Sequence, residues 1–195
     1  GSSCVNALST HMIATVAREG KIHQIEFSEG KTIKPLEVIG KTNKQVNGTT
    51  IWFQPDSTIF KETIEYDFQT IYNRLRESAF LNKGLKISLT DERVLDENEK
   101  PHRVDFYYEN GIQDFLEHLN KKREPITKEI FYVSDVQDDI SIETAFQYTT
   151  DFSDYTVSFA NNIKTAGGGT HETGFKSGIV SVIKQLIDEK DLIKD

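Results

Sequence analysis

Apolar residues recur with two different periods along this chain, and any fold must satisfy both. Over residues 67–80 they return every three or four positions, as on one face of a helix that packs against a sheet. Over residues 85–90 they alternate with polar residues, as in a half-buried strand. No internal repeat relates the segments. The mixture of helices and strands predicts an α+β fold of two units.

The other predicted elements follow the same two periods. Glu19-Gly20 predicts a tight hairpin between extended runs at 11–18 and 21–27. The acidic stretch 91–103 predicts an exposed loop between strands, and Asn110-Gly111 marks the predicted boundary between the two units. The remaining predicted strands lie near residues 36–39, 51–53, 104–108, 130–133, 140–148 and 155–159, and the remaining helices begin near residues 112 and 170.

Composition excludes several classes of protein. The 195 residues include 31 acidic and 23 basic ones, a formal net charge of −8, which argues against a surface built for broad contact with nucleic acid phosphates. The single cysteine, Cys4, permits no intrachain disulfide or cysteine-rich zinc site and fits a cytoplasmic compartment. Apolar runs are far shorter than the ~20 residues that span a bilayer, so we expect a soluble protein.

The first residues predict a segment of a longer protein. The only methionine is Met12, so Gly1 is not an ordinary start of translation. Either residues 1–11 are vector-derived or the chain begins inside a longer protein. Residues 4–9 favour the second alternative, because they resemble a short helix capped by Ser2 or Ser3 and not a linker.

Two glycine-containing segments precede predicted helices. Residues 167–169 are three glycines before Thr170, and backbone N–H groups at such a helix start can hold a phosphate. No Walker lysine follows, and the alternative is a flexible loop with Thr170 as the helix cap. A zinc site at His171-Glu172 is excluded because Phe175 stands where a second histidine is required. The other segment, Gly1-Ser2-Ser3, is either an anion site or a simple cap.

Three further features have ordinary explanations. Cys4 is better explained as a small packed residue than as a nucleophile, because no histidine can be placed beside it from sequence. The carboxylates of residues 91–99 are better explained as a polar loop than as a cation site. Arg18 and Lys21 flank the predicted hairpin and are most simply solvated surface residues.

Several segments, taken in order, resemble one protein family. They are Gly1-Ser2-Ser3-Cys4-Val5-Asn6-Ala7-Leu8-Ser9, residues 48–56 (GTTIWFQPD), 74–81 (RLRESAFL), 108–112 (YENGI), 158–163 (SFANNI) and 168–175 (GGTHETGF). Together they span nearly the whole chain and resemble the B subunits of bacterial type IIA DNA topoisomerases. Within that family, residues 77–80, 108–111 and 171–174 look more like the topoisomerase IV B subunit than the gyrase B subunit.

The resemblance implies an architecture and partners. Residues 1–110 would be the later part of a GHKL-type ATPase domain, a mixed sheet with helices. Residues 111–195 would be an incomplete transducer domain with a ribosomal-protein-like βαβ fold. In the family, ATP binding drives the dimerisation of two B subunits, which closes a gate for DNA, and an A subunit completes the heterotetramer.

The resemblance also implies roles for six residues. Gly1 would be the last glycine of the lid over the nucleotide phosphates, with Ser2-Ser3 beside it at the helix start. Thr49 would form a hydrogen bond, partly through water, toward the adenine amino group, and Ile51 would line that pocket. Arg18 matches an arginine at the pocket mouth that contacts aminocoumarin inhibitors.

Other family positions differ or lie outside this chain. Ala166-Gly167 stand where the family usually has an acidic residue. The glutamate that activates water, the asparagine that binds magnesium and the aspartate that binds adenine lie upstream of Gly1 in the family, and a lysine that reaches the γ-phosphate lies beyond Asp195. We therefore expect ATP and magnesium as cofactors of the parent protein and no catalytic or metal-binding residue within this chain.

The leading hypothesis is that the chain belongs to the ATP-binding and energy-transducing region of a topoisomerase IV B subunit and is inactive alone. The alternatives are a segment of a gyrase B subunit and a non-enzymatic binding module of the same fold.

Overall fold

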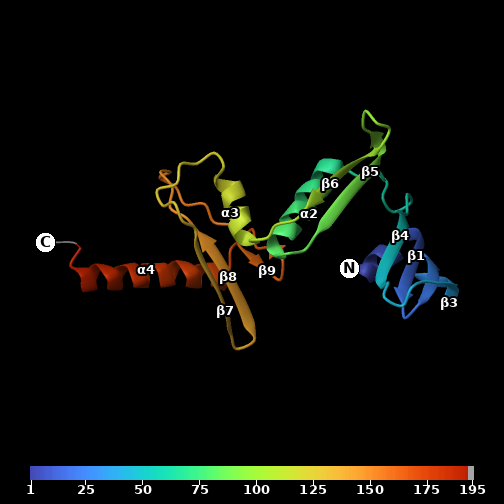
Figure 1. Ribbon diagram of the computed structural model, residues 1–195, viewed down its shortest axis with the longest axis horizontal. Helices are drawn as coiled ribbons and strands as arrows, with labels where there is room; N and C mark the ends of the chain where they lie inside the picture. The colour runs from blue at the N-terminus through green and yellow to red at the C-terminus, as the bar shows by residue number, and fades with distance from the viewer. Residues whose placement is uncertain (193–195) are drawn as a thin grey trace. The chain divides into compact units, whose positions relative to one another are not determined.

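The computed structural model describes residues 1–192 and divides into two compact units, Gly1–Asp67 and Phe68–Asp195. Both units combine helices with strands, as Figure 1 shows. The boundary between these compact units lies at residue 67, and the stack of Phe80 on Phe115 crosses residue 110. The domains 1–110 and 111–195 stay a prediction. No helix among residues 1–192 is long and apolar enough to cross a membrane.

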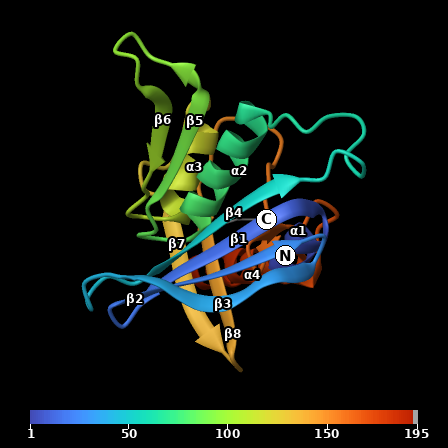
Figure 2. The same cartoon turned by 90° about the vertical axis from the view of Figure 1, so that its right-hand side faces the viewer.

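Unit 1 is a short helix with a four-stranded antiparallel sheet in the order β3-β2-β1-β4 (Figure 2). Its elements are α1 (Ser2–Ala7), β1 (Ser9–Arg18), β2 (Lys21–Ser28), β3 (Lys31–Lys41) and β4 (Gly48–Pro55). The hairpin predicted at Glu19-Gly20 is confirmed: both residues have positive φ, 52° and 80°, as a two-residue type I′ turn requires. The predicted first helix is also confirmed, but its N-cap is Gly1 and not Ser2 or Ser3.

Strand β3 is much longer than the strand predicted near residues 36–39. Pro35 lies inside it, and a proline within a run usually indicates a break. β3 is an edge strand, where a missing N–H can face solvent, and its register against β2 shifts between the pairs Gln24↔Glu37 and Glu26↔Lys34. A bulged edge strand therefore accommodates a proline whose sequence context predicts a loop.

A buried carboxylate ties three strands of this sheet together. Glu26 on β2 is only 7% exposed. It accepts a hydrogen bond from Lys34 Nζ on β3 at 2.6 Å and contacts His11 Nε2 on β1 at 2.9 Å. The bond from Lys34, followed by that from His11, lowers the pKa of Glu26 below its ordinary value. The carboxylate therefore stays charged and paired at neutral pH.

Unit 2, described over residues 68–192, contains three helices and three two-stranded ribbons. Helix α2 packs along the β5–β6 ribbon and against α3, and α3 also packs against β8 (Figure 1). All three helices were predicted from their apolar spacing and are confirmed. The elements are α2 (Phe68–Leu81), β5 (Ile87–Leu95), β6 (Pro101–Phe106), α3 (Ile112–Asn120), β7 (Phe131–Gln137), β8 (Ile140–Phe146), β9 (Phe159–Ala160), β10 (Ile163–Lys164) and α4 (Thr170–Lys190).

The core of unit 2 is built around Phe80, which is 2% exposed. Its ring stacks on Tyr108 with centroids 3.6 Å apart and on Phe115 of α3 at 5.0 Å. Phe115 in turn lies 6.1 Å from Phe159 of β9. The aromatic contacts therefore run from α2 through α3 to the β9–β10 hairpin.

Two predicted strands are shorter than expected. The strand predicted over residues 140–148 ends at Phe146, and an isolated bridge between Pro125 and Thr149 follows. The strand predicted over residues 155–159 shrinks to β9, Phe159–Ala160, since residues 155–157 pair with no strand in the described part of the chain. Alternation alone therefore overestimated strand length where no partner strand was present.

The acidic stretch 91–103 is mostly strand, contrary to the predicted loop. β5 and β6 pair from Ile87↔Phe106 to Leu95↔Pro101, so only residues 96–100 form the loop. Asp91, 9% exposed, accepts two hydrogen bonds from the Arg93 guanidinium at 2.8 and 2.7 Å. These bonds and the Arg93 backbone N–H lower the pKa of Asp91 to about 2. Asp91 and Arg93 thus form an ion pair along β5, within the stretch that was predicted as a loop.

This ion pair predicts a pH-dependent contribution to stability. Because the folded-state pKa of Asp91 lies below the ordinary value of 3.8, its contribution is present above that value and is lost as the pH falls through about 2. We expect Asp91→Asn to lower the free energy of unfolding at pH 7, by an amount that shrinks between pH 4 and pH 2. Urea unfolding across this range measures it, with exposed Glu97→Gln as the control. An equal loss at every pH would contradict the assignment.

Candidate functional site

Thr49 and Ile51 lie on one face of β4. They pair with Val16 and Ala14 of β1 and are two residues apart, so their side chains point to the same side of the sheet. Both are exposed, and Ile51 is 44% exposed although it is apolar. Thr50, between them, points to the opposite side. The predicted adenine-facing pair therefore forms a continuous, open patch.

Arg18 lies at the same end of the sheet as Thr49. It is the last residue of β1, two positions beyond the Val16 that pairs with Thr49. It forms an ion pair with Glu19, with Nε 3.4 Å from Oε1, and both side chains are more than 70% exposed. An ion pair in this setting contributes little to stability, so the guanidinium can exchange Glu19 for a ligand.

Gly1 is the N-cap of helix α1, which leads into the other end of β1. The Gly1 carbonyl accepts the N–H groups of Cys4 and Val5 at 3.0 and 3.1 Å. Ser2 and Ser3 are exposed, and no side chain among the described residues caps the helix. The first N–H groups of a helix have no partner inside it, so those of Ser2 and Ser3 are available to an acceptor.

A small apolar cavity shows on which side of the sheet α1 lies. Its volume is about 240 Å³, and Phe53 of β4 lines it together with Val5 of α1. Phe53 shares its face of β4 with Ile51 and Thr49, because the three residues alternate. Helix α1 therefore covers the side of the sheet on which Thr49 and Ile51 are exposed. The remaining residues that line the cavity are Cys4, Leu8, Ser9, Pro55, Phe60, Thr63, Ile64, Glu65 and Tyr66.

The structure thus brings some of the predicted residues together and separates others. Arg18, Thr49 and Ile51 lie at one end of the β1–β4 pair. The helix that begins at Gly1-Ser2-Ser3 joins β1 at Ser9, seven residues before Val16, which corresponds to ~24 Å along a strand. This distance separates the C-terminal end of α1 from the Thr49 end of the sheet, and α1 itself lies over the same side of the sheet.

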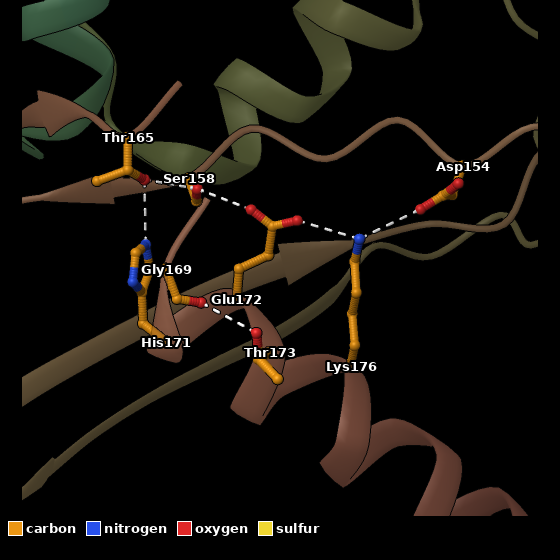
Figure 3. A network of polar contacts seen from close by, with 8 residues as sticks. All are labelled: Asp154, Ser158, Thr165, Gly169, His171, Glu172, Thr173 and Lys176. Carbon is orange, nitrogen blue, oxygen red and sulfur yellow. Dashed lines mark hydrogen bonds and ion pairs between the residues drawn. The ribbon is translucent and has the colours of Figure 1, made fainter. Parts of the chain in front are cut away.

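Polar side chains around the other glycine segment, residues 167–169, form a network at the start of α4 (Figure 3). Glu172 accepts hydrogen bonds from Ser158 Oγ at 3.1 Å and from Lys176 Nζ at 3.0 Å. The bond from Lys176 is the main cause of a lowered pKa of Glu172, with Ser158 second. Ser158 Oγ also lies 2.6 Å from Thr165 Oγ1. Carboxylate and hydroxyl groups thus occupy the end of α4 where a phosphate would have to bind.

Backbone geometry explains the glycines of this cluster. A Cβ on Gly169 would lie 2.6 Å from the His171 ring, and Gly168 has φ +74°. The N-cap of α4 is Gly169, so Thr170 is the first helical residue and not the cap that the sequence predicted. His171 Nε2 instead lies 3.1 Å from Thr165 Oγ1 (Figure 3). Gly169 thus makes room for the histidine ring, and Gly168 adopts a positive φ that other residues rarely adopt.

Part of this network was visible in the sequence. Glu172 and Lys176 are four residues apart, the spacing at which a glutamate and a lysine pair on a helix. The roles of Ser158 and Thr165 had no such signal, because they depend on how a loop returns to the helix. Among residues 1–192, no three His, Cys, Asp or Glu side chains gather in a way that could hold a metal ion.

Comparison with known proteins relates the whole chain to one family. The DNA gyrase B family model matches residues 111–195. The DNA gyrase B subunit of Bacillus mycoides is 43% identical over 195 residues, which are all of this chain and 46% of the relative. The DNA gyrase B subunit of Streptococcus pyogenes serotype M3 is 44% identical over all of this chain and 29% of its own length.

Solved structures agree with the sequence relatives. The 43K ATPase domain of Thermus thermophilus gyrase B, in complex with an aminocoumarin, superposes with a TM-score of 0.85 at 32% identity, over 97% of this chain and 50% of that one. The chain is homologous to type IIA topoisomerase B subunits. The topoisomerase IV ATP-binding domain of Francisella tularensis, in complex with a small-molecule inhibitor, has a TM-score of 0.77 at 31% identity, over 97% of this chain and 49% of that one.

The homology confirms the predicted α+β fold as that of the ATPase region of these B subunits. The chain spans less than half the length of the B-subunit relatives described above. The ligand-binding roles of six residues, Gly1, Ser2, Ser3, Arg18, Thr49 and Ile51, stay predictions.

Proposed function

We propose that this chain is part of the ATP-binding and energy-transducing region of a type IIA topoisomerase. ATP would bind over the face of unit 1 that carries Thr49 and Ile51, with the phosphates toward Gly1-Ser2-Ser3. Binding would drive dimerisation of two B subunits and close a gate for DNA, in an assembly with A subunits in the cytoplasm. Magnesium and the group that activates water would come from residues outside this chain.

The observation that carries the proposal is the superposition on the gyrase B ATPase domain over 97% of the chain. That domain binds an aminocoumarin. Arg18, the residue expected to contact such inhibitors, has its guanidinium exposed at the same end of the sheet as Thr49. The fold and the exposed positions of Arg18 and Thr49 thus support a single ligand-binding surface at this end of the sheet.

The sheet of unit 1 also presents apolar surface that a nucleotide site would use. Ile51 and Phe53 are 44% and 40% exposed on the face that carries Thr49. β4 is an edge strand without a charged residue, and native proteins usually protect such an edge. We infer that further parts of the parent protein cover this edge and enclose the adenine.

We further propose residues 111–195 as the transducer domain. The gyrase B family model begins at Gly111, the position at which the sequence predicts the boundary. The transducer would pass the nucleotide state of residues 1–110 to the parts of the enzyme that act on DNA. This is a coupling between two sites and not chemistry at the DNA itself.

Two members of the family remain candidates for the parent. Residues 77–80, 108–111 and 171–174 resemble the topoisomerase IV B subunit, which we propose, whereas the matched sequence relatives are gyrase B subunits. Reconstitution of the parent with either type of A subunit separates them. We expect ATP-dependent decatenation with the topoisomerase IV partner. Negative supercoiling with the gyrase partner alone would identify the parent as gyrase.

The chain by itself should not hydrolyse ATP, because its general base and magnesium ligand would lie outside it. We expect no turnover above background in a phosphate-release assay with the purified 195-residue chain and magnesium. The parent protein, assayed in parallel, should be active. Turnover by the chain alone, resistant to further purification, would contradict the assignment of the catalytic groups.

Thr49 and Thr50 offer a matched test of the nucleotide face. Loss of one hydrogen bond costs about 1 kcal/mol, so Thr49→Ala in the parent should weaken binding of a non-hydrolysable ATP analogue about fivefold. Thr50→Ala removes the same atoms from the opposite side of β4 and should leave affinity unchanged. Isothermal titration calorimetry measures both. Equal effects of the two substitutions would place the nucleotide elsewhere.

A further inference from the structure

Helix α4 has almost no core of its own. It is 21 residues long, yet none of its residues is buried, and Val182 and Leu186 are 64% and 47% exposed. Helices in proteins normally gain most of their stability from a packed apolar face. Within residues 68–192, the hydrogen bonds, ion pairs and ring contacts that join α4 to the rest of unit 2 lie in its first two turns. They are Phe175 on Phe146 of β8, at 5.7 Å, and the polar network of Figure 3.

The polar network attaches α4 to the base of the β9–β10 hairpin, at the start of β9 and at the end of β10. Ser158 immediately precedes β9, and Thr165 immediately follows β10. Ser158 Oγ donates to Glu172, and Thr165 Oγ1 contacts His171 Nε2. The two hydroxyls also bond each other at 2.6 Å, and the Thr165 N–H donates to the Ser158 carbonyl at 2.8 Å. The base of the hairpin is thus a single bonded unit at the start of α4.

The tip of the same hairpin is attached to α2 and to Asn82, the residue that follows α2. Arg74 Nη2 donates to the Asn162 carbonyl at 3.3 Å, and Asn162 Nδ2 donates to Asn82 Oδ1 at 3.2 Å. Asn161 and Asn162 have φ of 50° and 63°, so they form a type I′ turn that holds the Asn162 side chain in one direction. Phe159 adds the contact with Phe115 of α3.

We propose that the β9–β10 hairpin, called the clasp below, couples the position of α2 to the direction of α4. Bonds to Arg74 and Asn82 hold the tip in place relative to α2. Bonds to His171 and Glu172 hold the first turns of α4 in place relative to the base. Because α4 has no buried residue, these bonds at its first turns set its direction. The role of the clasp rests on the proposed function: it would join the nucleotide-binding part, which includes α2, to the transducer, which includes α4.

Asn162→Gly tests the clasp without breaking the turn. Asparagine followed by glycine is the preferred type I′ sequence, so the hairpin is retained while the bond to Asn82 is lost. We expect amide hydrogen exchange of residues 173–177 in the intact parent to accelerate about fivefold, as for the loss of one hydrogen bond. Thr165→Val, which removes the hydroxyl but keeps the shape, should have the same effect from the α4 side.

Matched controls separate the clasp from general destabilisation. Gln69→Ala removes a polar contact of α2, to Asn73, that does not involve the hairpin, and Gln185→Ala does the same on α4, to Glu189. Neither should change exchange at residues 173–177. Exchange that stays at the wild-type rate in Asn162→Gly would overturn the clasp, and so would an equal acceleration in Gln69→Ala.

A second measurement tests the functional consequence. If the clasp couples the two parts, Asn162→Gly should leave ATP turnover by the reconstituted enzyme within about twofold and lower strand passage per ATP about fivefold. A wild-type parent without ATP-dependent strand passage would contradict the proposed function, while the exchange result would still decide the clasp. Strand passage per ATP at the wild-type level would overturn the coupling.

Discussion

The stack of aromatic rings on Phe80 is the contact on which unit 2 depends. The ring is 2% exposed, and it holds Tyr108 and Phe115 at 3.6 and 5.0 Å. Phe115 lies 6.1 Å from Phe159, so the stack joins α2 and α3 to β9. The hydrogen bonds at the hairpin tip are exposed and individually weak. They can select one geometry only because the aromatic core has already brought α2, α3 and β9 together.

In unit 1 the equivalent constraint is the alternation of side chains along β4. It divides Thr49, Ile51 and Phe53 from Thr50 and sends the two sets to opposite sides of the sheet. A shift of one residue in the pairing with β1 would exchange these faces. The hairpin at Glu19-Gly20 and the bonds of Glu26 to its neighbouring strands fix the sheet to which β4 is added. The register in which β4 pairs with β1 therefore determines which side chains form the candidate nucleotide face.

Elements with a strong local signal could be predicted from the sequence, and elements defined by distant partners could not. Helices α2, α3 and α4 followed from apolar spacing, and the first hairpin followed from a glycine that tolerates positive φ. β3 was missed because Pro35 indicates a break unless its strand lies at an edge. The network at α4 was missed because Ser158 and Glu172 meet only after a loop has folded back. The roles of Thr49 and Arg18 came from resemblance, since neither residue has a distinctive local pattern.

Because α4 is attached near one end, a small movement of the clasp can change the direction of the whole helix. A helix buried along its length would resist small forces at one end, because many side chains would have to move together. α4 lacks buried side chains, and the hydrogen bonds, ion pair and ring contact that join it to the rest of unit 2 lie between Thr170 and Lys176. A change in the direction of its first turn is then carried along the helix, since an α-helix of 21 residues extends ~30 Å at 1.5 Å per residue. Small displacements of α2, transmitted through Asn162, would in this way produce larger displacements at the far end of α4.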